Sequence, residues 1–194
     1  MKTLLDYFEE KKNNPSDINE HLETFKRYSQ ECDVIVEMGV RWIVSTWAFL
    51  IGKPNKLTSI DIKHPIEYGA DINEVYRIAE ENGIEYEFRL ADTLICDIEP
   101  CDLLFIDTWH DYLQLKKELF RHHSKVRKYI IFHDTVSFGF SDEPIDGNWN
   151  NIRETNLPKG LNPAIDEFCN QNPNWYIHER FANNNGITIL KRLY

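Results

Sequence analysis

Short apolar runs alternate with helix-period segments along most of the chain. The apolar runs end at glycine or acidic residues, which predicts buried strands of a parallel sheet. Between them, apolar residues recur at helical spacing, which predicts crossover helices. The predicted strands are residues 33–38, 57–62, 86–90, 101–107 and 129–133, and the predicted helices are 45–51, 73–82, 112–123 and 161–170.

The last 20 residues predict a β-hairpin. Residues 175–181 and 187–192 have the composition of strands, and the turn sequence Asn183–Gly186 joins them. The last strand must therefore run antiparallel to its partner. We expect an α/β, Rossmann-like doubly wound sheet that is mostly parallel, with an antiparallel C-terminal hairpin strand and helices on both faces.

The first 30 residues predict two helices. An Asn-Asn-Pro sequence at 13–15 ends the first helix, and Ser16 or Asp17 can cap the second. We expect residues 1–30 to form a helical cap over the sheet or a ligand cleft. Residues 31–194 then form the main domain, and the two parts make one globular unit.

Charge and composition restrict the partners. The net charge is −10 over 194 residues, which repels a phosphate backbone. The basic group at 121–128 is interpreted as a solvated helix end. No segment has the length of a membrane helix or a signal-peptide core, and the four cysteines lack metal-binding spacing. We expect a cytoplasmic protein that binds neither nucleic acid nor membrane, and a homo-oligomer stays open.

Acidic residues occur at or just after the end of every strand in the predicted parallel sheet. The carboxyl ends of parallel strands meet at one edge, where ligands bind in open α/β folds. Packing of apolar strands does not require acids at a common edge, so we interpret them as site residues. They are Glu37, Asp61, Asp92, Asp107 and Asp134.

The residues at this edge suit a ligand with a ribose and one small anionic group. Asp61 stands where a carboxylate accepts hydrogen bonds from a ribose diol. Gly39 allows close approach of the backbone, and the predicted helix at Ser45 directs N–H groups at the cleft. A dinucleotide is disfavoured, because G-x-G-x-x-G is missing and Trp42 and Ile43 would obstruct a pyrophosphate. S-adenosylmethionine has the required groups.

Five segments together resemble class I S-adenosylmethionine-dependent methyltransferases, in the O-methyltransferase branch that includes cephalosporin-hydroxylase-like proteins. The segments are 36–39 (VEMG), 59–62 (SIDI), 90–92 (LAD), 104–112 (LFIDTWHDY) and 131–135 (IFHDT). The resemblance runs from about residue 31 to the C-terminus and implies S-adenosylmethionine as the cofactor. The cofactor-binding residues that it implies are Glu37, Gly39, Ser45, Asp61, Asp92 and Asp107.

The fourth and fifth predicted strands end at candidate catalytic residues. In metal-dependent members of the resembling family, the positions of Asp107 and Asp134 hold a divalent cation, and oxygen ligands favour Mg²⁺. Such a cation would lower the pKa of an acceptor hydroxyl. His110 and His133 could instead supply nitrogen ligands, favouring Mn²⁺, Fe²⁺ or Zn²⁺, or act as a general base. The candidate catalytic residues are therefore Asp107, His110 and His133.

The expected function is methyl transfer to a hydroxyl of a small molecule or sugar, with or without Mg²⁺. The irregular segment 138–152 has the length of a binding loop, and we expect it to cover the acceptor site. Two alternatives remain open. Ile43, in a loop where the family usually has a second glycine, favours a non-catalytic relative that binds a nucleoside or a protein. A metal-dependent hydrolase or oxygenase would instead use Asp107, His110, His133 and Asp134.

Overall fold

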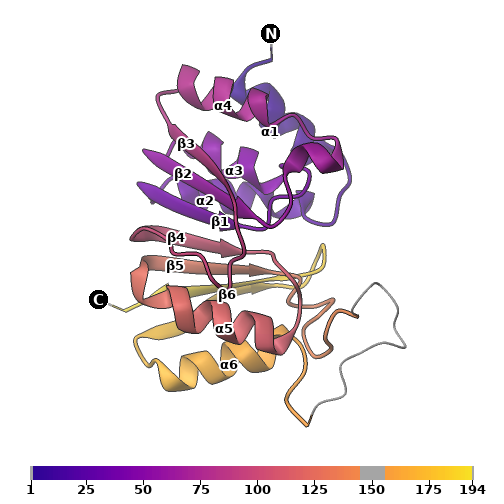
Figure 1. The fold of residues 1–194 in the computed structure, drawn as a ribbon, viewed down its shortest axis with the longest axis vertical. Coiled ribbons are helices and arrows are strands. Elements are labelled where there is room, and N and C mark those ends of the chain that lie inside the picture. The colour runs from indigo at the N-terminus through magenta and orange to yellow at the C-terminus, as the bar shows by residue number, and fades with distance from the viewer. Residues whose placement is uncertain (1, 145–155, 194) are drawn as a thin grey trace.

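A seven-stranded mixed sheet organises the computed structural model, which describes residues 2–144 and 156–193 (Figure 1). The strands are β1 Val34–Met38, β2 Lys56–Asp61, β3 Glu85–Leu90, β4 Cys101–Ile106, β5 Val126–His133, β6 Trp175–Phe181 and β7 Ile187–Arg192. The α-helices are α1 Leu4–Asn13, α2 Leu22–Ser29, α3 Ser45–Ile51, α4 Ile72–Glu81, α5 Tyr112–His122 and α6 Leu161–Gln171. The 3₁₀ helices are η1 Asn19–His21, η2 Pro65–Tyr68 and η3 His123–Lys125.

The strand order is β3-β2-β1-β4-β5-β7-β6, and β7 alone among the described strands runs against the others. This confirms the predicted sheet with its reversed hairpin strand. The chain winds outward from β1 in both directions, because β1 pairs with β2 on one side and with β4 on the other. Glu37 is in register with Ser59 of β2 and with Phe105 of β4. The strand order therefore reverses between β1 and β4, the position where open α/β sheets bind ligands.

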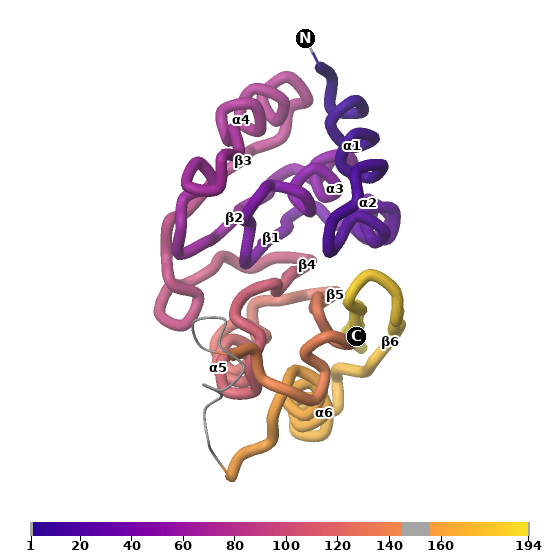
Figure 2. Tube along the Cα trace, turned by 90° about the vertical axis from the view of Figure 1, so that its right-hand side faces the viewer, coloured from indigo at the N-terminus to yellow at the C-terminus, as the bar shows by residue number. Residues whose placement is uncertain are grey.

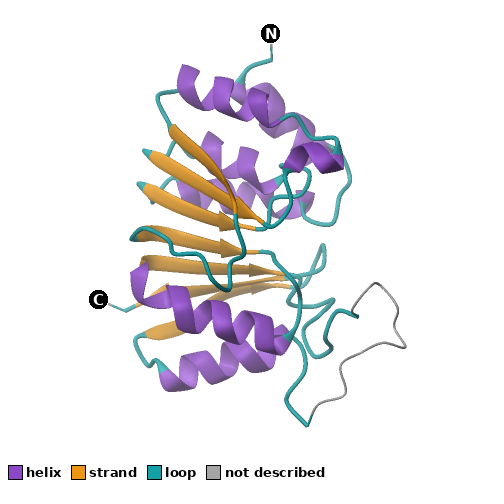
Figure 3. Cartoon of the chain, viewed as in Figure 1, coloured by secondary structure: helices purple, strands orange, loops and turns teal. Residues whose placement is uncertain are grey.

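Helices cover both faces of the sheet (Figures 1 and 3). Helices α1 to α4 bury their apolar residues in one core, and α5 and α6 bury theirs in a second core on the opposite face. Neighbouring residues of a strand point to opposite faces, so Ile35 belongs to the first core and Val36 to the second. Figure 2 shows α1 and α2 toward one end of the molecule and α5 and α6 toward the other.

The first two helices share a core with the sheet. Phe8 of α1 and Phe25 of α2 are fully buried with Phe105 of β4. The helices within residues 2–30 therefore pack against the sheet, and the division into a cap and a main domain stays a prediction.

The second helix begins later than predicted, with η1 at Asn19 and α2 at Leu22, and neither Ser16 nor Asp17 is its N-cap. Ser16 Oγ instead accepts a hydrogen bond from the backbone N–H of Asn19 in the turn before η1.

The N-terminal segment is also bound to the tip of the C-terminal hairpin. Asn184 Nδ2 donates to the carbonyl of Ser16 at 2.8 Å, and Asn184 Oδ1 accepts from the N–H of Glu20 at 3.0 Å. His21 Nε2 lies 2.9 Å from the carbonyl oxygen of Asn183. These contacts join the segment 16–21 to the turn of the C-terminal hairpin, beside His133 at the carboxyl end of β5.

The predicted strands and helices from residue 33 onward are all present. The largest difference in a boundary is at β5, which begins at Val126 rather than at 129. Within the described residues, no helix has the length and apolar character needed to cross a membrane.

The basic group at 121–128 is a solvated helix end only in part: Arg121 is exposed in the last turn of α5, but the interpretation was wrong for the rest. His122 is fully buried, and its Nε2 lies 2.8 Å from the carbonyl oxygen of Thr93. Arg127 and Lys128 belong to β5. The error has a physical cause: the pairing of Val126 with Cys101 of β4 starts the strand within the charged run.

Replacing Phe105 with alanine tests the first core. The rings of Phe25 and Phe49 lie 5.1 and 5.3 Å from that of Phe105, which is fully buried. We expect the cavity to lower the free energy of unfolding by about 3–5 kcal/mol in urea denaturation. Phe120→Ala removes an exposed ring of α5 and should change it by less than about 0.5 kcal/mol. Equal losses in the two variants would contradict this packing.

Candidate active site

A pocket of about 710 Å³ lies at the carboxyl ends of β1, β2 and β4. The segments that line it include 39–42, 60–63, 92–94 and 107–109. Five predicted cofactor residues are among its lining residues: Gly39, Ser45, Asp61, Asp92 and Asp107. The sequence prediction of one ligand edge therefore agrees with the position of the pocket.

Gly39 is required where β1 meets β4. Its φ is +87°, and a Cβ atom built on it would lie 1.9 Å from the carbonyl oxygen of Asp107. A side chain at this position would force the two strand ends apart. The loop continues with positive φ at Arg41 and Ile43, an uncommon conformation for non-glycine residues.

Asp61 holds this loop in place. One carboxylate oxygen, Oδ2, accepts hydrogen bonds from the N–H groups of Val40 and Arg41 at 2.8 and 3.2 Å. The other, Oδ1, accepts from the N–H of Lys63 at 2.9 Å. Oδ2 thus uses both of its lone-pair sites, whereas Oδ1 can accept one more hydrogen bond. Asp61 can therefore support the loop and also accept from a ribose hydroxyl, a role that stays a prediction.

Glu37 lies behind the pocket wall. Its carboxylate is fully buried and accepts hydrogen bonds from the hydroxyls of Ser45, Ser59 and Thr46 at 2.5, 2.6 and 2.8 Å. Burial raises the pKa of Glu37 to about 7, although the three hydroxyls oppose this shift. The structure connects Glu37 to the pocket through Ser45. Direct contact between Glu37 and a cofactor stays a prediction.

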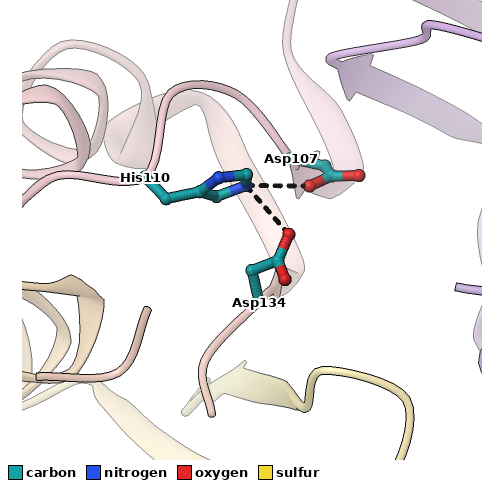
Figure 4. A group of neighbouring side chains, drawn as sticks. All are labelled: Asp107, His110 and Asp134. Atoms are coloured by element: carbon teal, nitrogen blue, oxygen red, sulfur yellow. Dashed lines mark hydrogen bonds and ion pairs between the residues drawn. The ribbon is translucent and has the colours of Figure 1, made fainter. Parts of the chain in front are cut away.

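Two carboxylates and two imidazoles meet at the ends of β4 and β5, and Figure 4 shows three of these residues, Asp107, His110 and Asp134. His110 Nε2 lies 3.2 Å from Asp107 Oδ1 and 3.1 Å from Asp134 Oδ2. His133 Nδ1 lies 3.3 and 3.2 Å from the same two oxygens. The four residues that the sequence singled out at these strand ends are therefore direct neighbours. We call them the acid–histidine cluster.

Sequence reasoning missed Glu143. Its Oε2 lies 2.8 Å from His110 Nδ1, and its N–H donates to the carbonyl oxygen of His110 at 2.7 Å. Glu143 also lines the pocket. It belongs to the predicted acceptor loop 138–152, of which residues 145–152 lie outside the described part of the chain. No pattern in the sequence marks it, because its contact with His110 spans 33 residues.

Charge in the cluster keeps both imidazoles protonated. Burial alone would lower the pKa of His110, but the carboxylates of Asp107 and Glu143 outweigh it and raise that pKa to about 9. Asp107 and Asp134 likewise raise the pKa of His133 well above its usual value, against the effect of burial. The histidines in turn hold the pKa of Asp107 far below its usual range, although burial opposes this. Either histidine must lose a proton before it can act as a base or a ligand.

The cluster has the donors that a divalent cation requires. Asp107, His110 and Asp134 each offer one ligand atom, and these atoms lie within 4.8 Å of one another. Asp134 Oδ1 is buried and has no hydrogen-bond partner within residues 2–144 and 156–193. The bond from His110 Nδ1 to Glu143 directs Nε2 toward the two aspartates, as carboxylates do beside metal-binding histidines. Two oxygens and one nitrogen suit Mn²⁺, Fe²⁺ or Zn²⁺ as well as Mg²⁺.

No protein-family model matches the sequence, and neither does any curated protein. Solved structures do match. An O-methyltransferase from Bacillus cereus in complex with SAH (S-adenosylhomocysteine) is 17% identical, with a TM-score of 0.63 over 97% of this chain and 90% of that one. A SAH-bound methyltransferase from Podospora anserina is 12% identical, with a TM-score of 0.59 over 98% and 88%.

A third match is the N-terminal domain of EvdMO1, solved in the presence of SAH and D-fucose. It is 12% identical, with a TM-score of 0.54 over 94% of this chain and 85% of that one. At these identities the likeness shows the fold alone. The chain has the fold of class I S-adenosylmethionine-dependent methyltransferases, similar to their O-methyltransferases, as the sequence motifs predicted.

Protonation of His110 should make stability depend on pH. Because the pKa of His110 in the folded protein, about 9, exceeds the unfolded value of about 6.5, the proton stabilises the folded state. This stabilisation is complete below about pH 6.5 and is lost as the pH rises through 9. In metal-free buffer, the stability difference between wild type and His110→Asn should shrink by about 3 kcal/mol between pH 6 and 9.5. A difference that stays constant over this pH range would contradict the assignment.

Proposed function

We propose that this protein is an S-adenosylmethionine-dependent methyltransferase that methylates a hydroxyl group of a small molecule or sugar. The observation that carries the proposal is the pocket at the strand-order reversal, with Asp61 on its wall and Asp107 of the acid–histidine cluster beside it. The SAH-bound proteins of the same fold support the cofactor. The EvdMO1 domain, solved with SAH and a sugar, supports a small polar acceptor.

The proposed placement of the cofactor follows the order of the strands. Asp61 of β2 accepts from the ribose hydroxyls, and the loop from Gly39 to Ser45 faces the methionine part. The segment that begins at Asp92 after β3 faces the adenine. The methyl group then points toward Asp107, where β4 ends against β1. A pocket of about 710 Å³ has room for a ligand of this size and leaves one side for an acceptor.

In the proposed reaction, the acceptor oxygen forms a bond to the methyl carbon while the bond from that carbon to sulfur breaks. The electron pair of the broken bond stays on sulfur, which becomes the neutral thioether of S-adenosylhomocysteine, and the hydroxyl proton is released to water. Alignment of the two reactants supplies much of the rate in such a transfer. A divalent cation held by Asp107, His110 and Asp134 would lower the pKa of the hydroxyl. Glu143 keeps His110 oriented, and Asp107 faces the pocket.

The four cysteines are free, which supports the proposed cytoplasmic location. The proposal includes no nucleic-acid partner, because the net charge is −10.

The acid–histidine cluster favours a second candidate function. Its mixed nitrogen and oxygen donors are those of metal-dependent hydrolases and oxygenases, and Asp134 Oδ1 has no hydrogen-bond partner among the described residues. In that case activity would require the cluster and not Asp61. The two functions therefore differ in their response to a change at Asp61.

Titration calorimetry with S-adenosylmethionine and SAH tests the proposed function. We expect micromolar binding to the wild type and about 10- to 100-fold weaker binding to Asp61→Ala, because the loop and the ribose both lose a charged acceptor. Asp166→Ala removes an exposed acid of α6 and should leave the affinity unchanged. Absence of binding to the wild type would refute the methyltransferase proposal and leave the second candidate.

Cation binding is tested separately. We expect the protein to bind Mn²⁺, followed by electron paramagnetic resonance, and Asp134→Asn to weaken this binding at least about 10-fold. The loss follows because the variant removes one anionic ligand. Asp166→Asn serves as the control. Equal affinity in the wild type and Asp134→Asn would exclude the cluster as the cation site.

A further inference from the structure

Glu118 is a buried carboxylate that the proposed chemistry does not use. It lies in the middle of α5 and is fully buried. Its carboxylate accepts hydrogen bonds from the hydroxyls of Thr93 and Thr108, at 2.5 and 2.9 Å, and from the side-chain amide of Gln114 at 2.8 Å. A carboxylate in this position is costly to bury, so its retention calls for a role beyond packing.

The three donors come from three segments that line the pocket. Thr93 lies in the connection between β3 and β4, Thr108 is the second residue after β4, and Gln114 lies in the first turn of α5. One carboxylate therefore holds together three parts of a single pocket wall. Leu115 and Leu119 beside Glu118 belong to the apolar second core, which by itself would not fix these polar groups.

Helix α5 holds the segment after Asp92 at further points. One turn beyond Glu118, His122 Nε2 lies 2.8 Å from the carbonyl oxygen of Thr93. Arg121 donates to the carbonyl oxygens of Ile95 and Cys96, each at 2.5 Å. The helix thus binds both the side chain and the backbone of this segment. Of Glu118, Arg121 and His122, Glu118 is the one that also accepts hydrogen bonds from Thr108 and Gln114.

Glu37 has a comparable arrangement on the opposite face of the sheet. Its carboxylate is also fully buried and accepts from three hydroxyls, one of which belongs to the pocket residue Ser45. The pocket is therefore backed by a buried carboxylate on each face.

We propose that Glu118 is a positioning residue of the cofactor pocket. Its carboxylate orders the wall formed by Thr93, Thr108 and Gln114, against which the adenosine half of S-adenosylmethionine lies. This inference rests on the proposed function and assigns Glu118 no contact with the cofactor. Removal of the carboxylate leaves three donors without their acceptor, so the wall loses its order before the rest of the fold does.

Glu118→Leu and Glu118→Gln test the proposal by calorimetry with SAH and with 5′-methylthioadenosine, which lacks the amino-acid part. We expect Glu118→Leu to weaken both ligands by the same factor, about 10- to 100-fold. Glu118→Gln keeps a carbonyl acceptor and should restore most of the affinity. Hydrogen exchange should become faster in residues 92–96 of Glu118→Leu, a local effect that a general loss of stability does not produce.

Asp102→Leu is the matched control. Asp102 is also buried, accepts from the backbone N–H groups of Asp33 and Val34, and pairs with Arg127 at the amino-terminal edge of the sheet. We expect this variant to lose stability and to keep its affinity for SAH. An equal loss of SAH affinity in Asp102→Leu and Glu118→Leu would overturn the proposal.

Unchanged SAH affinity in a folded Glu118→Leu would also overturn it. If Glu118→Leu does not fold, Thr93→Val serves as the test, because it removes one donor to the carboxylate. We expect Thr93→Val to bind SAH several-fold more weakly, and an unchanged affinity would overturn the proposal. A wild type that does not bind SAH would refute the proposed function itself. The two proposals therefore fail by different results: the proposed function by absent SAH binding in the wild type, and the role of Glu118 by unchanged SAH affinity in its variant.

Discussion

The close contact between the ends of β1 and β4 is the constraint on which the site depends. Gly39 follows β1 with a positive φ, and a Cβ there would overlap the carbonyl oxygen of Asp107. The N–H of Asp107 donates to the carbonyl oxygen of Met38 at 2.8 Å, so the hydrogen bonds between β1 and β4 continue to Met38, the last residue of β1. This contact places the loop after β1 beside Asp107. The proposed cofactor pocket and the acid–histidine cluster therefore meet at Asp107, which belongs to both.

Buried charge is the second organising feature. Glu37 and Glu118 each give up hydration and gain three hydrogen-bonding side chains, and burial raises the pKa of each to about 7. In the acid–histidine cluster the charges compensate one another, so that imidazolium and carboxylate stabilise each other at distances of 3.1–3.3 Å. The polar groups around the pocket are therefore held by a few long-range interactions and not by the apolar cores alone.

Prediction from the sequence was reliable for the elements from residue 33 onward and for the edge of the sheet at which the pocket lies. An apolar run followed by an acid identifies a strand and its end, and the topology rule places those ends together. Asp107 and Asp134 were expected to be neighbours for this reason. The start of β5 was misplaced because Val126 joins the sheet through pairing with Cys101, a contact that local composition does not reveal.

The sequence by itself determined the fold class, the reversed last strand and the acids at the ligand edge, because these follow from periodicity and turn chemistry within short windows. Only the tertiary structure decided how the acids are used. Glu143 reaches His110 across 33 residues, and Glu118 reaches Thr93 across 25. It also placed Glu37 behind the pocket wall and put His110 among the carboxylates that raise its pKa. Burial, proton affinity and hydrogen-bond partners depend on residues distant in the chain, so they arise only when the chain folds.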